Sequence, residues 1–283
     1  MVAVTLGGSP SGHFRSEATQ NRMPFANGVS PHGQDLDDGL HGRIHIEIFG
    51  PPGAGKTTLA RAAAADLARH GLAVRLAISA RPSESVASRR FALTSRLSKL
   101  GGAVSQILSS DPVTERLLKL MPLPRWSASL RRRRYIAGLA RFARVDGVLV
   151  QDQGYLCAIA GLALDSKRTD ESIIAQALDV VPLPDIAVGL CVSNEVSAKR
   201  LNQRHANQGI AARVLERPPA DNECLEQIFA VIDAKLQMRS LSVLRVFGRD
   251  QSDLKAAVSL ITKGALAIDH ARALGRLHGA AVP

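Results

Sequence analysis

Aromatic residues are scarce in this 283-residue sequence, where they make up only 4% of the chain. Apolar residues as a whole reach 46%, and many of them are Ala and Leu. The chain can therefore bury a core, which excludes disorder throughout, and most of the packing should come from aliphatic helices against a sheet. This composition favours a helix-rich α/β protein.

Cysteine is also rare, and long apolar runs are missing. Cys157, Cys191 and Cys224 are an odd number at wide spacing, which excludes a disulfide framework and a zinc site with paired ligands, so we expect reduced thiols. No uncharged apolar stretch reaches about 18 residues, and no basic start with an apolar run opens the sequence. We expect a cytoplasmic protein that does not bind membranes.

Acidic residues are outnumbered by basic ones, 25 against 36, which gives a formal charge of +11. A basic balance favours anionic partners such as nucleotides, phosphorylated metabolites, nucleic acid or an acidic surface. The net charge alone does not distinguish among these partners.

The first 42 residues are rich in Gly, Ser, Pro and Asn, with little apolar periodicity. We expect residues 1–42 to form a flexible tail, because such a segment cannot offset the entropy of ordering. Its acidic residues Asp35, Asp37 and Asp38 are interpreted as solvated rather than as a metal site. A folded domain is expected at 43–268, and a helical extension or tail at 269–283.

Short apolar runs alternate with helical stretches from Arg43 onward, and no internal repeat is found. Such alternation predicts a three-layer α/β fold, with a parallel sheet of about five strands flanked by helices. The expected strands are residues 43–49, 72–78, 147–150, 186–192 and 243–247.

A glycine-rich segment with the pattern G-x-x-x-x-G-K-T follows the first strand and precedes a helix. Its glycines let successive backbone N–H groups point inward, and the helix adds the positive end of its dipole, so the segment suits the phosphates of ATP. Lys56 would add a charge at the β and γ phosphates, and Thr57 a hydroxyl for Mg²⁺. The expected nucleotide-binding residues are Gly50, Pro51, Pro52, Gly53, Ala54, Gly55, Lys56, Thr57 and Thr58.

Asp152 follows a neighbouring apolar run and is expected to share the metal with Thr57. Open α/β sheets bind ligands at the carboxyl ends of their strands, and Asp152 fits that position. Asp146 and Asp185 precede strands and therefore lie at the wrong end.

Two large classes of P-loop protein are not indicated. The Asn-Lys-x-Asp segment of GTPases and the Ser-Gly-Gly-Gln signature of transporter ATPases are both missing. The remaining large class transfers phosphoryl groups to small molecules.

Over residues 43–268 the sequence resembles the thymidylate kinase and nucleoside monophosphate kinase group. The similarity includes the first strand with Gly-Pro-Pro-Gly-Ala-Gly-Lys-Thr-Thr, Arg81-Pro82-Ser83 as a degenerate acceptor loop, and Asp152-Gln153 in place of Asp-Arg. It continues through Leu190 to Arg204 and ends at Asp250-Gln-Ser252. The resemblance implies a kinase that moves the γ-phosphoryl group of ATP, with Mg²⁺, to a nucleotide or another metabolite. Gln153 and the degenerate loop leave open whether the acceptor carries a phosphate or a hydroxyl.

The resemblance also assigns roles to charged residues around the γ phosphate. Arg204 and Arg213 are the preferred charge stabilisers and Arg200 is the next, with a lid at 205–219 that also holds Arg217. If the acceptor carries a phosphate, Arg81 would bind it, beside Gln153. If the acceptor carries a hydroxyl, Asp152 would accept its proton.

An arginine-rich stretch at 125–144 supports an alternative. It holds seven arginines and no acid, above an apolar stripe of Tyr135, Leu139 and Phe142. Such a helix is usually solvated, but it could bind nucleic acid in an ATPase or a nucleotide-dependent switch. Trp126 and Tyr135 are expected to pack in the core or at its rim. A nucleotide-binding accessory protein with weak catalysis and a homodimer are also left open.

Overall fold

The computed structural model describes residues 43–78, 111–140, 142, 146–207, 221–248 and 250–279. In chain order the elements are β1 (Arg43–Phe49), α1 (Lys56–Arg69), β2 (Val74–Ala77), α3 (Pro112–Leu120), α4 (Trp126–Ala140), β3 (Gly147–Gln151), α5 (Tyr155–Ser166), α6 (Glu171–Val180), β4 (Ile186–Cys191), α7 (Asn194–Asn207), α9 (Asp221–Met238), β5 (Val243–Phe247) and α10 (Gln251–Gly279).

The five strands form one sheet in the order β2-β3-β1-β4-β5, and every neighbouring pair is parallel. β1 is the central strand: Glu47 pairs with Gln151 of β3 on one side and with Ala187 of β4 on the other. From β1 the chain first runs to the edge strand β2, returns inward to β3 beside β1, and then crosses to β4 and β5. This change of direction places the carboxyl end of β1 where doubly wound sheets bind ligands.

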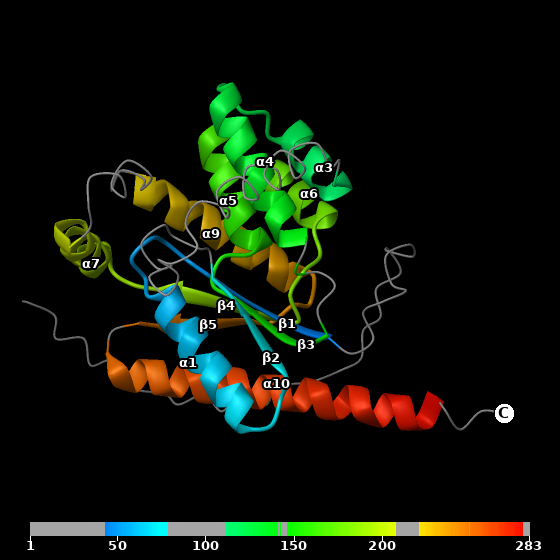
Figure 1. The fold of residues 1–283 in the computed structure, drawn as a ribbon. Helices are drawn as coiled ribbons and strands as arrows, with labels where there is room; N and C mark the ends of the chain where they lie inside the picture. Colours follow the sequence, from blue (N-terminus) through cyan, green and yellow to red (C-terminus); the bar gives the residue numbers. More distant parts are fainter. Residues whose placement is uncertain are drawn as a thin grey trace, which may run out of the picture. The chain divides into compact units, whose positions relative to one another are not determined.

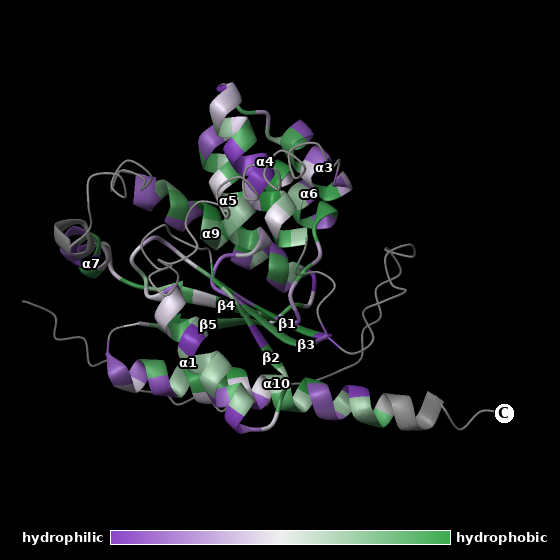
Figure 2. Cartoon of the chain, in the orientation of Figure 1, coloured by the Kyte–Doolittle hydropathy of each residue, from purple (hydrophilic) through white to green (hydrophobic). Residues whose placement is uncertain are grey.

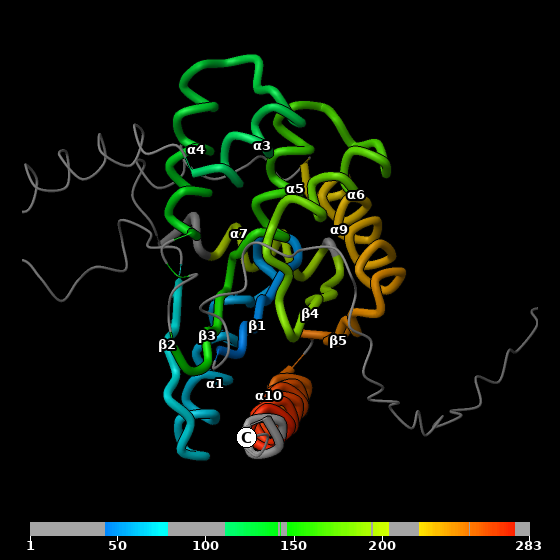
Figure 3. Tube along the Cα trace, turned by 90° about the vertical axis from the view of Figure 1, so that its right-hand side faces the viewer, coloured from blue at the N-terminus to red at the C-terminus, as the bar shows by residue number. Residues whose placement is uncertain are grey.

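Helices cover both faces of the sheet (Figures 1 and 3). α1 and α10 pack against each other and against one face, while α5 and α9 cover the other face. α4 and α6 pack against α5, and α3 packs against α4 and α6. Each interface has its own buried apolar cluster. The predicted three-layer α/β fold with five parallel strands is therefore confirmed.

β1 shows how the two faces are specified by alternating residues. Ile44, Ile46 and Ile48 pack in the cluster beneath α1 and α10, whereas Phe49 packs in the cluster on the α5 side. Because side chains alternate along a strand, His45 and Glu47 share the α5 side with Phe49. Figure 2 shows the strands as mainly apolar, and these two polar residues are buried within them.

Helix ends follow local sequence signals. Asp111 caps α3, because its carboxylate accepts a hydrogen bond from the Thr114 N–H at 3.0 Å, and Pro112 takes the first helical position. α1 ends before Gly71, whose φ of +82° lies in the left-handed region that favours glycine. Both boundaries are therefore set by residues at the helix ends themselves.

α10 extends past residue 268, the expected end of the folded domain. It continues to Gly279, so residues 269–279 are helical, which is one of the two alternatives expected for 269–283. Arg272 ties this part of α10 to the sheet, because its guanidinium donates to Asp185 Oδ1 at 2.5 Å and to the Arg43 carbonyl oxygen. Among the described residues, no helix has both the length and the apolar character needed to cross a membrane.

Several expectations fall outside the described residues. They are the tail at 1–42 with its acidic cluster, the loop carrying Arg81 to Ser83, and Arg213 and Arg217 of the expected lid.

Candidate active site

The loop between β1 and α1 depends on glycine for its backbone path. Gly50, Gly53 and Gly55 have φ values of +140°, +80° and +98°, which L side chains rarely adopt. Gly55 is the N-cap of α1, no side chain caps this helix end, and its first turn contains no acid. The helix start therefore presents a positive dipole end that no side chain caps or neutralises, as an anion site requires.

Close packing against β4 and α7 also restricts the loop. A Cβ on Gly50 would lie 2.6 Å from the Leu190 carbonyl oxygen, and one on Gly53 would lie 2.8 Å from that of Ser197. The Ser197 hydroxyl donates to the Pro52 carbonyl at 2.5 Å. Ser197, whose role was not anticipated, thus fixes the loop from α7.

The Lys56 side chain folds back into the loop and is only 8% exposed. Its ammonium donates to the carbonyl oxygens of Gly50 and Pro51, each at 2.8 Å. The positive charge is thereby held within the curve of the loop, beside the start of α1.

Thr57 and Asp152 meet at the carboxyl edge of the sheet. Asp152 follows β3, is 1% exposed, and accepts a hydrogen bond from the Thr57 hydroxyl at 2.6 Å. Mg²⁺ prefers oxygen ligands and commonly takes one or two from protein while keeping water and phosphate oxygens. This hydroxyl and carboxylate fit such a site, although the described residues include no group of three or more His, Cys, Asp and Glu suited to hold a metal.

The arginines expected near the γ phosphate are only partly described. Arg200 on α7 donates to the Gly248 carbonyl at 2.9 Å and to the Ala54 carbonyl at 3.4 Å. It therefore links the expected phosphate loop, residues 50–55, to the segment that follows β5. Arg204 belongs to the same helix, but its side chain lies outside the description, as do Arg213 and Arg81.

Gln153 lies next to Asp152 in the turn before α5. Its backbone carbonyl accepts a hydrogen bond from the Tyr135 hydroxyl at 3.2 Å. Tyr135 packs against the core cluster on this side of the sheet, as expected. Burial raises the pKa of Tyr135 well above its usual value, so the hydroxyl keeps its proton and can donate.

Glu47 is the main residue that sequence reasoning missed. Its side chain is fully buried, and Oε1 accepts hydrogen bonds from the N–H groups of Gly154 (3.1 Å), Leu156 (2.8 Å) and Cys157 (3.3 Å). Burial raises its pKa to about 7, against the opposing effect of these hydrogen bonds. The available signal was the alternation of His45 and Glu47 with three isoleucines in β1.

The cysteines are all free thiols, as predicted. Cys157 lies close to the phosphate loop, and burial raises its pKa to about 12. Its thiol therefore stays protonated at neutral pH and is a poor nucleophile.

The basic helix α4 differs from a uniformly solvated one. Arg132 donates to Asp165 at 2.7 Å and to the Gly161 carbonyl at 3.3 Å, and Arg133 forms an ion pair with Glu115. Arg131 and Arg134 are exposed. The expectation that Trp126 packs in the core or at its rim was wrong, since it is 78% exposed at the first residue of α4.

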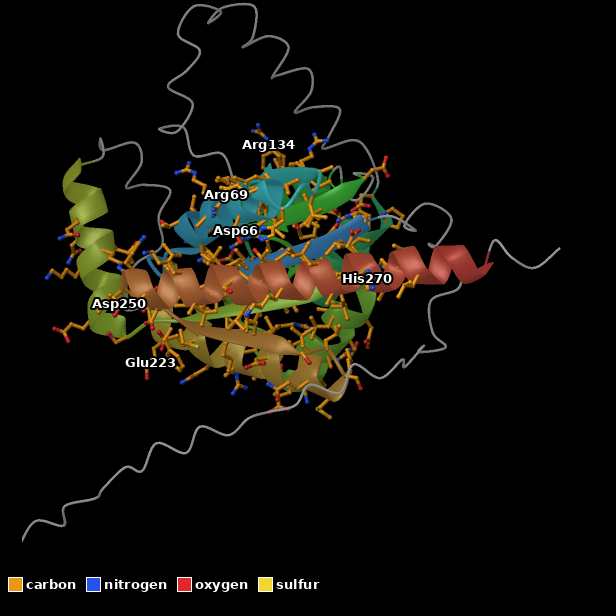
Figure 4. The ribbon with its side chains drawn as sticks, turned by 90° about the horizontal axis from the view of Figure 1, so that it is seen from below. Asp66, Arg69, Arg134, Glu223, Asp250 and His270 are labelled. Atoms are coloured by element: carbon orange, nitrogen blue, oxygen red, sulfur yellow. The ribbon has the colours of Figure 1, made fainter. Side chains whose placement is uncertain are left out.

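A groove of about 630 Å³ between α1 and α10 is separate from this site. Asp66 and Arg69, which line it, are labelled in Figure 4, and Asp66 accepts a hydrogen bond from the Thr262 hydroxyl at 2.6 Å. None of the residues expected to bind ATP or Mg²⁺ lines the groove. Its shape reflects helix packing, and we assign it no function.

Comparisons with known proteins give matches of low similarity. No protein-family model matches the chain, and no curated protein matches it. Among solved structures, the chain is similar to a deoxyadenosine kinase from M. mycoides with the products dCMP and a flexible dCDP bound. The two are 16% identical with a TM-score of 0.45, over 80% of this chain and 100% of that chain. It is also similar to thymidylate kinase from Ehrlichia chaffeensis, at 16% identity and a TM-score of 0.40, over 78% and 98% of the two chains.

Proposed function

We propose that this protein is a P-loop kinase that transfers the γ-phosphoryl group of ATP to a small acceptor, a nucleotide or another metabolite. The observation that carries the proposal is the Thr57 hydroxyl at 2.6 Å from the Asp152 carboxylate, beside Lys56 at the start of α1. A hydroxyl, a carboxylate and an ammonium at the mouth of a glycine loop are the groups that bind Mg²⁺ and nucleotide phosphates.

In this proposal the phosphates bind the backbone N–H groups of the loop and the start of α1, which no side chain caps. The Lys56 ammonium would exchange its two carbonyl partners, Gly50 and Pro51, for oxygens of the β and γ phosphates. Because those partners are neutral, a charged phosphate oxygen is the stronger acceptor. Lys56 needs only a small movement, since it is already folded into the loop.

Thr57 and Asp152 would hold Mg²⁺, which, when bound, neutralises charge on the phosphate oxygens. The Thr57 hydroxyl would then turn its lone pair toward the metal instead of donating its proton to Asp152. If the acceptor carries a hydroxyl, Asp152 is also the carboxylate that accepts its proton.

Arginines would stabilise the charge that develops during transfer. In the proposal, Arg204 and Arg213 are the main residues that stabilise this charge. Arg200 contributes a charge held beside the loop by its bonds to Ala54 and Gly248. Arg81 and Gln153 are proposed to contact the acceptor, and Arg81 would bind an acceptor phosphate.

The test is ADP release from ATP and Mg²⁺ across a panel of nucleotides, nucleosides and small sugars. Lys56→Ala and Asp152→Asn should each lower acceptor-dependent turnover by about 100-fold or more, because each removes a group that stabilises transferring charge. Turnover that ignores every acceptor but rises with RNA or DNA would contradict the proposal and favour a nucleic-acid-dependent ATPase. ATP binding without any turnover would indicate an accessory nucleotide-binding protein.

A further inference from the structure

We propose that Glu47 is a positioning residue that fixes Asp152 for magnesium binding by holding the turn Asp152–Gly154 and the first turn of α5. The inference rests on the proposed function, because it assumes that Asp152 serves the metal. Glu47 itself does not touch the nucleotide in this account.

The first step of the argument is the cap that Glu47 provides. The first N–H groups of a helix have no partner within the helix, and the N-cap of α5, Gly154, has no side chain to supply one. Glu47 Oε1 accepts three of these hydrogen bonds, from Gly154, Leu156 and Cys157. β1 therefore supplies the cap across a separation of 107 positions in the sequence.

Space around Gly154 supports the same pairing. Its φ of −110° is open to any residue, so backbone freedom does not explain the glycine. A Cβ at this position, however, would lie 2.5 Å from Glu47 Oε2 and 2.8 Å from Gln151 Oε1. Glycine is thus needed here because the Glu47 carboxylate occupies the place of a side chain.

The turn is also held from its other side. The Tyr135 hydroxyl on α4 donates to the carbonyl oxygens of Gln153 at 3.2 Å and Gly154 at 3.4 Å. Glu47 holds N–H groups and Tyr135 holds carbonyl groups of the same short segment. Asp152 stands at the start of this segment, so its carboxylate is fixed relative to Thr57.

Filling space in the core does not by itself explain why an acid stands at position 47. Among the residues that the structure describes, its Oε2 is buried without a hydrogen-bond partner, and burial of such a group is costly. An aliphatic residue would fill the same space in β1 without that cost. The advantage of glutamate lies in the bonds that Oε1 makes to the turn and to α5.

The test measures the Mg²⁺ concentration that gives half-maximal ATP binding by calorimetry, with ATP and MgCl₂ as the probes. Glu47→Ala should raise that concentration by about tenfold or more, the effect typical of losing a group that orients a metal ligand. Glu47→Gln should stay close to wild type, because its amide oxygen can accept the same hydrogen bonds. Ile46→Val, a change on the opposite face of β1, controls for general loosening of the core and should also stay close to wild type.

If Glu47→Ala does not fold, Gly154→Ala is a second variant that tests the same inference. The added methyl group would displace the Glu47 carboxylate, and the Mg²⁺ requirement should rise. The inference is overturned if Glu47→Ala or Gly154→Ala matches Ile46→Val in Mg²⁺ requirement, or if Glu47→Gln is impaired as severely as Glu47→Ala. Wild-type protein that shows no Mg²⁺-dependent ATP binding would instead overturn the proposed function, and this inference with it.

Discussion

The hydroxyl of Thr57 and the carboxylate of Asp152 are separated by 95 positions in the sequence, yet they meet at 2.6 Å. Thr57 stands in the first turn of α1, and Asp152 follows β3, the strand beside β1. Two parallel strands that end at the same edge of the sheet bring them together. Their oxygens then form the part of the site best suited to a hard cation.

Replacing Thr57 by Val keeps the branched shape and removes only the hydroxyl. We expect Mg²⁺-dependent turnover to fall by at least about tenfold, because one protein ligand of the metal is lost. Steady-state kinetics at several Mg²⁺ concentrations measures this effect. Thr169→Val is the control, since Thr169 is exposed between α5 and α6 and is not among the expected site residues; equal turnover in the two variants would argue against a metal role for Thr57.

Glu47 also gives the fold a pH dependence. Its pKa rises from 4.5 to about 7 on folding, so between these pH values the folded state binds more protons than the unfolded state. The stability that Glu47 contributes is therefore fully present below about pH 4.5 and is lost as the pH rises through about 7. His45, whose pKa burial lowers to about 4, has the opposite effect, because the unfolded state binds its proton more readily.

Glu47→Gln should escape this loss, because glutamine does not ionise. Its free energy of unfolding, relative to that of wild type, should increase by about 2–3 kcal/mol between about pH 5 and about pH 8. Urea unfolding at the two pH values measures the change, and His45 cancels because both proteins contain it. Parallel pH profiles would show that Glu47 ionises normally in the folded protein.

Among the elements, the phosphate loop has little freedom to change. Gly50→Ala would place a Cβ 2.6 Å from the Leu190 carbonyl oxygen at a φ of +140°. We expect a loss of at least about 1–3 kcal/mol from backbone strain and a loss of ATP binding. Gly71→Ala is the matched control, because its φ is +82° and nothing lies within 4 Å of the new Cβ; it should cost about 1–2 kcal/mol and leave ATP binding intact. Intact ATP binding in Gly50→Ala would contradict the account of the loop.

α4 is attached to α5 by one arginine of its basic run. Arg132 and Asp165 are both largely buried, with 14% and 20% of their side chains exposed. Arg132→Ala should lower the free energy of unfolding by about 2 kcal/mol, the usual loss for hydrogen bonds that involve a charge. Arg134→Ala should stay within about 0.5 kcal/mol, since its side chain is exposed. If urea unfolding gave the same loss of unfolding free energy for both variants, the Arg132–Asp165 ion pair would not stabilise the fold.

Sequence reasoning succeeded for elements whose signals are local. The strands at β1, β3 and β5 are short apolar runs, and Asp111-Pro112 and Gly71 mark helix ends directly. It was less successful where packing decides the outcome: the exposure of Trp126 depends on neighbouring elements. The role of Glu47 could not be predicted, because its partners lie 107 to 110 positions away.

In the molecule as a whole, the candidate site residues lie at one edge of the sheet. The phosphate loop, Asp152 and Arg200 come from β1, β3 and α7 and meet where the strand order changes direction. This arrangement could be anticipated, because the glycine motif fixes the end of β1 and parallel strands align their carboxyl ends. The identity of the acceptor could not be anticipated, because local patterns do not specify the shape of a binding site formed by distant segments.

The net charge of +11 is compatible with either a nucleotide or a nucleic acid as partner. α4 weakens the nucleic-acid interpretation, since Arg132 and Arg133 are committed to Asp165 and Glu115. Arg131 and Arg134 are the arginines of its central run that are exposed. A metabolite kinase should keep its turnover when these two residues are replaced by Ala.

The most direct measurement follows the γ-phosphoryl group itself. With γ-labelled ATP, Mg²⁺ and the acceptor panel, the account predicts that label appears covalently on one class of acceptor, and that Asp152→Asn abolishes this transfer. Label that appears only as free phosphate, at the same rate with and without acceptors, would contradict the assignment of this protein as a kinase.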